Sequence, residues 1–470
     1  MSWIREKIET GRVVVMGLGK SGLAAARFLL RQGAEVMVSE DAARETINPE
    51  ILAWLTAKNI RSEFGGHSVE LFVSADLIVV SPGVPLDLPV LLAARAKNIP
   101  VIGELAFAAD YLRTPVVAVT GTNGKTTVTT LLGELLKADG KNVFVGGNIG
   151  TPLADYLVTS QDADVVVLEV SSFQLDTAEN FRPDVGVLLN ITPDHLDRYD
   201  SFGEYGDSKF RLFAGQGSGD KMIINHDDPE IMKHLTLSPP GAGQRFFFGC
   251  DPQDSNKATV QDGRVTVRLA GDGSEEVYEL PAILRNPPNN ENSMAAILGA
   301  RLMGCSERGI NRGLADFSTL PHRLALVADI AGVSYFDDSK ATNIGAVDSA
   351  LKAMTRPVIL IAGGRDKGGD YRLLRSTVER HVKTMLLIGE ARDKMAESFA
   401  GLVEVEKLES LAQAVRRASE IAVSGDVVLL SPACASFDQF ASYVERGTVF
   451  QGEVFKVREK ADRQSMLQVA

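Results

Sequence analysis

Cysteine is scarce in this chain, whose 470 residues include three, at Cys250, Cys305 and Cys434. The number is odd, the spacing is wide and the sequence contains no Cys-x-x-Cys pair. Neither a disulfide framework nor a zinc site is therefore indicated. This usage fits a reducing compartment.

Positively charged residues are outnumbered, since 49 Lys and Arg stand against 61 Asp and Glu for a formal net charge of -12. No cluster of Lys and Arg supplies the phosphate-neutralising surface that nucleic-acid binding requires. We expect no nucleic-acid partner, and any bound phosphate should belong to a small molecule.

Long apolar runs are lacking too. No uncharged stretch approaches the roughly 20 residues that span a bilayer. Residues 1–11 are charged and lead directly into a strand-like run, without the apolar core and cleavage site of a signal peptide. We expect a cytoplasmic protein with no membrane partner.

The composition that remains is typical of an α/β protein. At roughly 150 residues per domain, the length suggests about three domains. Short apolar runs alternate with segments of helical period, which favours parallel sheets with helices on both faces. The predicted strands cover residues 13–17, 36–39, 77–81, 101–102, 116–120, 143–145, 165–170, 185–190, 222–225, 333–336, 358–362, 385–388 and 427–431.

These strands fall into three blocks, which predict domains at 1–104, 105–320 and 321–470. The first and third should be Rossmann-like. The middle one should combine a parallel sheet with a small antiparallel sheet, because residues 258–280 alternate apolar and polar side chains around Asp-Gly turns. Residues 284–300 predict a loop that runs into a helix, ahead of a hinge near Leu320.

The strongest motif follows the apolar run 116–120 and reads Gly121-Thr122-Asn123-Gly124-Lys125-Thr126, with Thr127 and a helical stretch behind it. A glycine loop at a helix amino terminus turns backbone N–H groups toward phosphate oxygens, while the lysine reaches the terminal phosphates and the threonine hydroxyl can ligate Mg²⁺. We interpret it as a P-loop for ATP. The usual spacing would place a first glycine at Val119.

A second glycine motif, Gly17-Leu18-Gly19-Lys20-Ser21-Gly22, follows the first predicted strand, with Glu40 roughly 20 residues further on. Alone, this fingerprint would indicate an NAD-dependent oxidoreductase. A UDP diphosphate at the helix terminus meets the same description, and so does a purely structural turn.

Polar residues also follow two strands of the middle block. Glu169 ends one of them, where its carboxylate can meet the Mg²⁺ held by Thr126. His195 lies among acids after the next strand and is a candidate for a second metal or phosphate contact. The structural alternatives are a solvated strand-end acid and a packed histidine.

The third block carries three polar segments, each directly after a strand, at residues 337–343, 363–370 and 431–440. Strand carboxyl ends share one edge of a doubly wound sheet, so these segments can converge on one ligand. Their cationic and hydroxyl groups suit a substrate that carries a carboxylate. Three solvated loops are the alternative.

Together, the segments 121–126, 169–172, 338–343 and 431–436 resemble the Mur ligase family, in the family's order and over nearly the whole chain. The resemblance implies a monomeric, ATP-dependent ligase of cell-wall synthesis that works through an acyl phosphate with two Mg²⁺ ions. Segments 438–440 and 446–447 are most similar to those of the family branch that joins D-glutamate to UDP-N-acetylmuramoyl-L-alanine. We expect the third domain to close on these substrates.

The resemblance also implies roles for single residues. The ATP-binding residues would be Gly121, Thr122, Asn123, Gly124, Lys125, Thr126, Thr127, Asn292, Arg323 and Asp338. The UDP-precursor pocket would comprise Gly17, Gly19, Lys20, Ser21, Ser39, Glu40, Ser81, Gly83, Asn148, Ser171 and Gln174. D-glutamate would contact Thr342, Lys367, Ser436 and Tyr443. The catalytic residues would be Lys125, Glu169, His195, Lys209 and Lys340. The metal ligands would be Thr126, Glu169, His195 and Lys209, the last once it is carbamylated.

Two departures from the family pattern stand out. Residues 286–289 read Asn-Pro-Pro-Asn where the family commonly has Gly-x-His-Asn, on the adenine side. Tyr443 replaces a Phe and adds a hydroxyl beside the amino acid. Three alternatives stay open at this point: a sibling ligase such as a folate polyglutamate enzyme, an NAD-dependent oxidoreductase, and a non-catalytic ATP switch or partner-binding protein.

Overall fold

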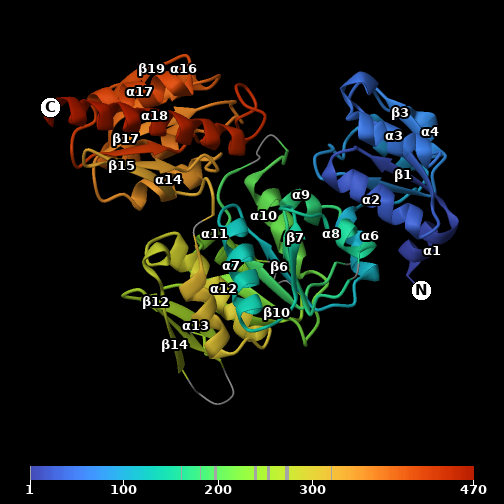
Figure 1. Ribbon diagram of the computed structural model, residues 1–470. Helices are drawn as coiled ribbons and strands as arrows, with labels where there is room; N and C mark the ends of the chain where they lie inside the picture. The colour runs from blue at the N-terminus through green and yellow to red at the C-terminus, as the bar shows by residue number, and fades with distance from the viewer. Residues whose placement is uncertain are drawn as a thin grey trace. The chain divides into compact units, whose positions relative to one another are not determined.

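The computed structural model describes residues 2–159, 161–179, 181–194, 198–237, 241–250, 254–269, 275–318 and 320–469, without the side chains of 464–469. It divides into two compact units (Figure 1). The first unit comprises Met1–Ile191, Gly203–Glu279 and Asn292–Asp316, and the second comprises Thr192–Phe202, Leu280–Glu291 and Phe317–Ala470.

The first unit begins with a five-stranded parallel sheet in the order β3-β2-β1-β4-β5. Its strands are β1 (Arg12–Met16), β2 (Glu35–Glu40), β3 (Arg61–Phe64), β4 (Leu77–Val80) and β5 (Val101–Gly103). The central strands β1 and β4 are runs of buried aliphatic residues, because helices cover both faces of a parallel sheet. The helices of this part are α1 (Trp3–Thr10), α2 (Lys20–Arg31), η1 (Arg44–Thr46), α3 (Pro49–Ala57), α4 (Val69–Val73), α5 (Pro89–Ala96) and α6 (Glu104–Tyr111).

The same unit continues with a nine-stranded sheet in the order β14-β13-β12-β11-β10-β9-β6-β8-β7. Its strands are β6 (Val116–Thr120), β7 (Val143–Gly147), β8 (Val165–Glu169), β9 (Val185–Leu188), β10 (Lys221–Asn225), β11 (Gln244–Phe248), β12 (Lys257–Gln261), β13 (Arg264–Arg268) and β14 (Glu275–Glu279). The predicted antiparallel strands are confirmed as β12 to β14, and β12 pairs in parallel with β11, so that they extend the main sheet.

Helices pack on this sheet, and α7 (Lys125–Ala138) lies against α13 (Glu307–Asp316) in Figure 1. A side chain at Gly313 would collide with Leu135, so the glycine permits the close approach. The other helical segments of this unit are α8 (Leu153–Val158), α9 (Ser172–Leu175), α10 (Phe202–Phe210), η2 (Arg211–Phe213), α11 (Pro229–Leu237) and, from Asn292, α12 (Asn289–Leu302), while η3 (Ala282–Leu284) belongs to the second unit. The predicted loop at 284–300 that runs into a helix is confirmed, since α12 begins at Asn289.

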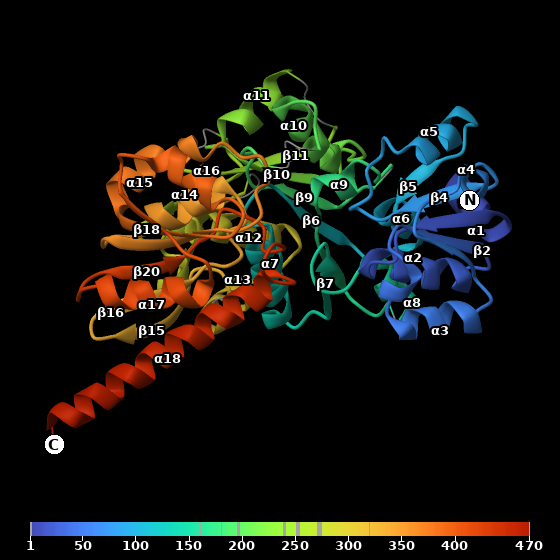
Figure 2. The ribbon, with the colours of Figure 1, turned by 90° about the horizontal axis from the view of Figure 1, so that it is seen from above.

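The second unit contains a six-stranded sheet in the order β15-β16-β20-β17-β18-β19. Its strands are β15 (Ala325–Ile330), β16 (Val333–Asp337), β17 (Val358–Gly363), β18 (Val382–Ile388), β19 (Glu404–Lys407) and β20 (Val427–Leu430), and only the β15–β16 pair is antiparallel. The helices are α14 (Ile344–Lys352), η4 (Tyr371–Leu374), α15 (Arg375–His381), α16 (Arg392–Phe399), α17 (Leu411–Ile421) and α18 (Tyr443–Val469). Figure 2 shows the last turns of α18 running beyond this sheet.

Three sheets of α/β type therefore match the predicted fold class, and every predicted strand coincides with an observed one. Strands β3, β11, β15 and β19 were not predicted. Along the described residues, no helix has the length and apolar character needed to cross a membrane. The domain boundaries at residues 104 and 320 stay a prediction.

Candidate active site

The loop between β6 and α7 depends on two glycines. Gly121 has φ +150° and Gly124 has φ +84°, both in the region that side chains disfavour. A Cβ on Gly124 would lie 2.3 Å from Oδ1 of Asn292, which is buried on α12. The loop backbone thus stays bare at the amino terminus of α7, as phosphate binding requires.

Asn190 holds this loop in place. Its Oδ1 accepts from the N–H groups of Thr122 at 3.1 Å and Asn123 at 2.8 Å, while its backbone oxygen accepts from Thr122 at 2.9 Å. Its Nδ2 donates to the Asn123 oxygen at 3.1 Å. Asn190 can do this because it follows β9, the parallel neighbour of β6. Sequence reasoning placed it in a polar cluster and missed this role.

Two lysines converge on one carbonyl of the loop. Lys125 Nζ donates to the oxygens of Gly121 and Thr122, each at 2.8 Å, and Lys209 Nζ donates to the same Gly121 oxygen at 2.9 Å. Lys209 is only 1% exposed and its ammonium lies 4.4 Å from the centre of the Tyr205 ring. The Tyr205 hydroxyl lies 3.2 Å from Oγ1 of Thr122. A buried cation thus stands beside the phosphate loop.

Glu169 lies where the end of β8 meets this loop. The parallel register pairs Val119 with Glu169, which brings the carboxylate level with the start of the P-loop. Thr126 Oγ1 donates to Glu169 Oε2 at 2.6 Å, and Asn148 Nδ2 donates to Oε1 at 2.9 Å. A hydroxyl and a carboxylate are the oxygen ligands that Mg²⁺ prefers, so this pair fits such an ion. His195 lies outside the described residues.

The segment after β8 is hydrogen-bonded to α10, the helix that carries Lys209. Ser171 and Gln174 form a capping box that starts α9: the Ser171 hydroxyl accepts from the Gln174 N–H, and Gln174 Oε1 accepts from the Ser171 N–H at 3.0 Å. Ser208 Oγ on α10 donates to the Ser172 oxygen at 3.0 Å. Thr127 is buried in the first turn of α7. The structure therefore brings these predicted residues around one P-loop.

The first glycine motif forms a second tight loop, after β1. Gly17 has φ +92°, and a Cβ on Gly22 would lie 1.9 Å from the Gly17 oxygen. Ser81 Oγ approaches the same oxygen at 3.4 Å, and the Gly17 N–H donates to the Ser39 oxygen at 2.8 Å. Gly19 precedes α2, whose first residue Lys20 is exposed, and Gly83 lies in the turn after β4. The predicted diphosphate loop is thus assembled from three strand ends.

Glu40 is used differently from the acid of a dinucleotide site. Its Oε2 accepts from the Leu18 N–H at 2.5 Å and its Oε1 from the Ala42 N–H at 3.0 Å. In a dinucleotide fold this carboxylate binds a ribose hydroxyl instead. Here it stabilises the backbone of the glycine loop.

In the second unit, the three predicted polar loops do converge. They follow β16, β20 and β17, which are adjacent and parallel, so their carboxyl ends share one edge. Arg446, only 1% exposed, donates to the oxygens of Ser339 and Cys434 at 2.9 and 3.2 Å and to Ser339 Oγ at 3.0 Å. The Arg365 N–H donates to the Ala435 oxygen at 2.9 Å. All three loops are therefore fixed to one another.

Several predicted residues lie on these loops. Burial raises the pKa of Asp338 to about 7, although Ser431 Oγ donates to it at 2.9 Å and the Arg323 guanidinium lowers that pKa. Lys340 Nζ lies 3.9 Å from the centre of the Tyr443 ring, so the tyrosine at this position contacts a predicted catalytic lysine through its ring face.

The remaining three predicted residues, Thr342, Lys367 and Ser436, lie one on each of these loops. Lys367 Nζ is 3.7 Å from Asp194 Oδ1, and Asn343 Nδ2 donates to Asp194 Oδ2 at 2.9 Å. The Thr342 N–H donates to the Lys340 oxygen, and Ser436 is buried.

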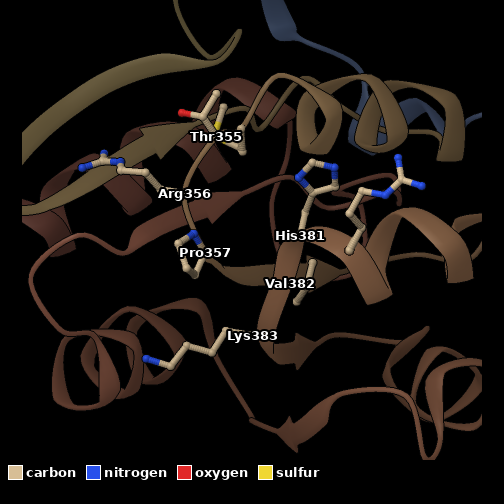
Figure 3. A pocket seen from close by; sticks show the side chains of 8 residues that line it. Thr355, Arg356, Pro357, His381, Val382 and Lys383 are labelled. Carbon is tan, nitrogen blue, oxygen red and sulfur yellow. The ribbon is translucent and has the colours of Figure 1, made fainter.

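A cavity of about 610 Å³ opens at the opposite edge of this sheet, at the starts of β17 and β18. Figure 3 shows Arg356 and Pro357, which precede β17, and His381 and Lys383, near the start of β18, among the side chains that line it. Arg356 donates to Ser334 Oγ, and Lys383 Nζ donates to Asp426 at 2.8 Å. Arg356 and Lys383 thus stabilise the fold. The cavity lies at the amino ends of β17 and β18, whereas the polar loops follow the carboxyl ends of β16, β17 and β20.

Family models cover most of the chain. The Mur ligase MurD-like N-terminal domain matches residues 11–103, the Mur ligase middle domain matches 119–300, and the Mur ligase glutamate ligase domain matches 322–434.

Curated relatives and solved structures agree with these models. Proteins named "UDP-N-acetylmuramoylalanine--D-glutamate ligase" from Desulfosudis oleivorans and Acidobacterium capsulatum are 46% and 44% identical, each over 96% of this chain and 97% of the relative. The pseudomurein peptide ligase type C of Methanothermus fervidus has a TM-score of 0.61 at 20% identity, over 95% of this chain and 100% of its own. The MurF ligase of Thermotoga maritima in complex with ADP has a TM-score of 0.58 at 19% identity, over 97% of this chain and 100% of its own. The chain belongs to the Mur ligase family.

Proposed function

We propose that this protein joins D-glutamate to UDP-N-acetylmuramoyl-L-alanine, with ATP cleaved to ADP and phosphate, in peptidoglycan precursor synthesis. The observation that carries the proposal is the P-loop, where Lys125 donates to two loop oxygens and Thr126 donates to Glu169. Relatives at 40–46% identity that bear the name of this reaction support the choice of substrates.

The reaction must first activate a carboxylate, because a carboxylate is a poor acyl donor. An oxygen of the L-alanine carboxylate attacks the γ-phosphorus of ATP, the bond to the β–γ bridging oxygen breaks, and ADP leaves. The D-glutamate amine then attacks the acyl carbon and loses a proton, and inorganic phosphate departs as the amide forms. Phosphoryl transfer of this kind is catalysed chiefly by positioning and electrostatic stabilisation.

The P-loop would supply both the positioning and the electrostatic stabilisation. Backbone N–H groups at the start of α7 would face the phosphates, and Asn190 would hold the preceding loop in place through the N–H groups of Thr122 and Asn123. Lys125 would neutralise charge on the terminal phosphates once ATP draws its ammonium from the Gly121 and Thr122 oxygens. The bare glycines leave room for this approach.

Thr126 and Glu169 would hold Mg²⁺, with His195 and a carbamylated Lys209 as further ligands. A bound divalent cation would offset charge on the phosphoryl oxygens. Lys209 stands 2.9 Å from the Gly121 oxygen, so its modified side chain would begin beside the phosphate loop. Asn148, which orients the Glu169 carboxylate, would face the precursor.

The first glycine loop would bind the UDP diphosphate through Gly17, Gly19, Lys20 and Ser21, with Ser39, Glu40, Ser81 and Gly83 around it. The loops of the second unit would bind D-glutamate. Lys367, Thr342 and Ser436 offer a cation and hydroxyls to its carboxylates, and Lys340 and Tyr443 form a cation–π pair beside them. Asn292, Arg323 and Asp338 would contact the nucleoside of ATP.

The protein would act in the cytoplasm as a monomer. Its three cysteines, Cys250, Cys305 and Cys434, are odd in number and widely spaced, which suits a reducing compartment. Membership in a ligase family disfavours the oxidoreductase and switch alternatives. The sibling-ligase alternative differs in the amino acid and is separated by the experiment below.

Phosphate release by the purified protein with ATP and Mg²⁺ tests the proposal. UDP-N-acetylmuramoyl-L-alanine and D-glutamate are added singly and then together, and we expect release only when both are present. Release with L-glutamate, L-alanine or a diamino acid in place of D-glutamate would point to a sibling ligase. Absence of release with every combination would contradict the ligase assignment.

A further inference from the structure

Glu104 is a buried carboxyl that none of the proposed catalytic roles uses. It begins α6 directly after β5 and is only 4% exposed. A carboxyl at such a depth needs hydrogen-bond partners, because burial without them is costly. Its partners identify what it does.

These partners come from two different segments of the first unit. Glu104 Oε1 accepts from the N–H of Ala154 at 2.7 Å, and the N–H of Leu153 also donates to this carboxyl. Both residues open α8, a few positions after Asn148. The Ser21 hydroxyl donates to the same group from the first turn of α2, inside the first glycine loop. Figures 1 and 2 both show α2, α6 and α8 side by side.

The preceding residue makes a third connection. The Gly103 N–H donates to the Thr177 oxygen at 2.8 Å, three residues after Gln174. A Cβ on Gly103 would lie 2.2 Å from Oγ1 of Thr177, so only glycine permits this approach. Gly103 and Glu104 therefore contact the first glycine loop at Ser21, the segment that follows Asn148 at Leu153 and Ala154, and the segment that follows Gln174 at Thr177.

We propose that Glu104 is a positioning residue that holds the diphosphate loop of the first sheet at a fixed separation from the precursor-binding segments of the second sheet. The inference rests on the proposed function. A long precursor that contacts both places binds well only if their spacing is set in advance, since ordering two mobile parts on binding lowers affinity. None of the residues proposed to bind ATP lies on the first sheet or its loops, so ATP binding does not depend on this spacing.

The test compares kinetic constants of Glu104→Ala, Glu104→Asp and Glu104→Gln with those of the unmodified protein, by coupled phosphate release. We expect Glu104→Ala to raise KM for UDP-N-acetylmuramoyl-L-alanine about tenfold or more, with KM for ATP changed less than twofold. Glu104→Asp, one methylene shorter, cannot reach Ala154 and Ser21 together and should raise the same KM about fivefold. Glu104→Gln keeps the accepting oxygen and should stay within about threefold.

If Glu104→Ala does not fold, the precursor KM of Glu104→Asp tests the same prediction. The matched control is Asp220→Ala. Asp220 is also a buried carboxyl of the first unit, and it accepts from Arg182 and from the Gly217 N–H. It lies directly before β10, at the amino end of that strand in the nine-stranded sheet. It should lower the melting temperature while leaving KM for the precursor unchanged.

Ser21 provides a second readout, because it is also proposed to bind the diphosphate. If it also acts through Glu104, Ser21→Ala should raise the precursor KM by a larger factor in the unmodified protein than in the Glu104→Asp background, where only its direct contact with the diphosphate is lost. Equal fold-changes in both backgrounds would overturn the proposal, as would a folded Glu104→Asp or Glu104→Ala variant with unchanged precursor KM. Failure of the proposed function is distinct, since the unmodified protein would then release no phosphate.

Discussion

The hydroxyl of Thr126 donates a hydrogen bond of 2.6 Å to the carboxylate of Glu169. Glu169 ends β8, whereas Thr126 lies in the first turn of α7, and the parallel register of β6 and β8 brings the two residues together across 43 positions. The hydroxyl and the carboxylate thus lie side by side, as two oxygen ligands of one Mg²⁺ ion would.

Glu169→Gln removes the charge of this pair and keeps its shape. We expect kcat for phosphate release to fall about 10²–10³-fold, because charge stabilisation in the phosphoryl-transfer site is lost. The Mg²⁺ concentration for half-maximal rate should rise as well. A titration of rate against Mg²⁺ at saturating ATP measures both, and an unchanged Mg²⁺ dependence would contradict the metal role of Glu169.

Lys125→Ala should abolish acyl-phosphate formation while precursor binding is retained. The ammonium is the cation nearest the P-loop carbonyls, and its loss should lower the rate at least about hundredfold. Isothermal titration with UDP-N-acetylmuramoyl-L-alanine checks the binding. Near-normal turnover would show that another group provides the charge.

Asn190→Ala should raise KM for ATP about tenfold, since two loop N–H groups lose the acceptor that orients them. The matched control is Asn225→Ala. Asn225 is a buried asparagine that ends β10, the strand next to β9, and it donates to the Leu189 oxygen at 2.8 Å. It should change stability alone. Equal KM for ATP in both variants would place the loop's support elsewhere.

Arg446→Ala should destabilise the second unit by about 3 kcal/mol or more. It leaves buried backbone oxygens of Ser339 and Cys434 without their donor. Arg417→Ala, which breaks the partly exposed pair with Glu406 at 2.8 Å, should lower stability far less. Thermal unfolding followed by circular dichroism compares them, and similar melting temperatures would contradict the anchoring role.

Stability should depend on pH through Glu104, whose pKa burial raises to about 7. The carboxylate of Asp155 raises this pKa further, and the Ser21 hydroxyl and the Ala154 N–H lower it. An unfolded glutamate titrates at about 4.3, so between pH 4 and 7 the unfolded chain loses its proton first. This group should therefore cost about 3 kcal/mol of stability as pH rises through that window, and the cost should be constant above it. Glu104→Gln should abolish that part of the pH dependence in urea unfolding; an identical profile would contradict the raised pKa.

The central strands were predictable because each is a continuous apolar run that parallel sheets bury on both faces. Strands β3 and β19 escaped prediction because two of the four residues of RSEF and three of the four of EVEK are charged, and because both strands lie at sheet edges, where one side of the backbone faces solvent. The P-loop was predictable from local glycine chemistry. The role of Asn190 was not, because it depends on which strand lies beside β6.

The roles of charged residues in the site also depend on contacts with distant segments. Lys209 and Glu104 have ordinary neighbours in the sequence and gain their roles only through burial against distant segments. Arg446 lies in a stretch whose helical pattern shows nothing of the three loops it joins. A pattern along the chain carries no information on such contacts between loops.

Strand β14 lies at the free edge of the nine-stranded sheet, with the sequence EEVYE. An exposed edge offers unpaired backbone groups to any extended segment of another molecule. Three of its five residues are glutamates, of which Glu275 and Glu276 form ion pairs with Arg268 and Arg301, so this edge presents charged and not apolar side chains to a second copy. Edge-to-edge aggregation in a crowded cell is thereby opposed by the outermost strand itself.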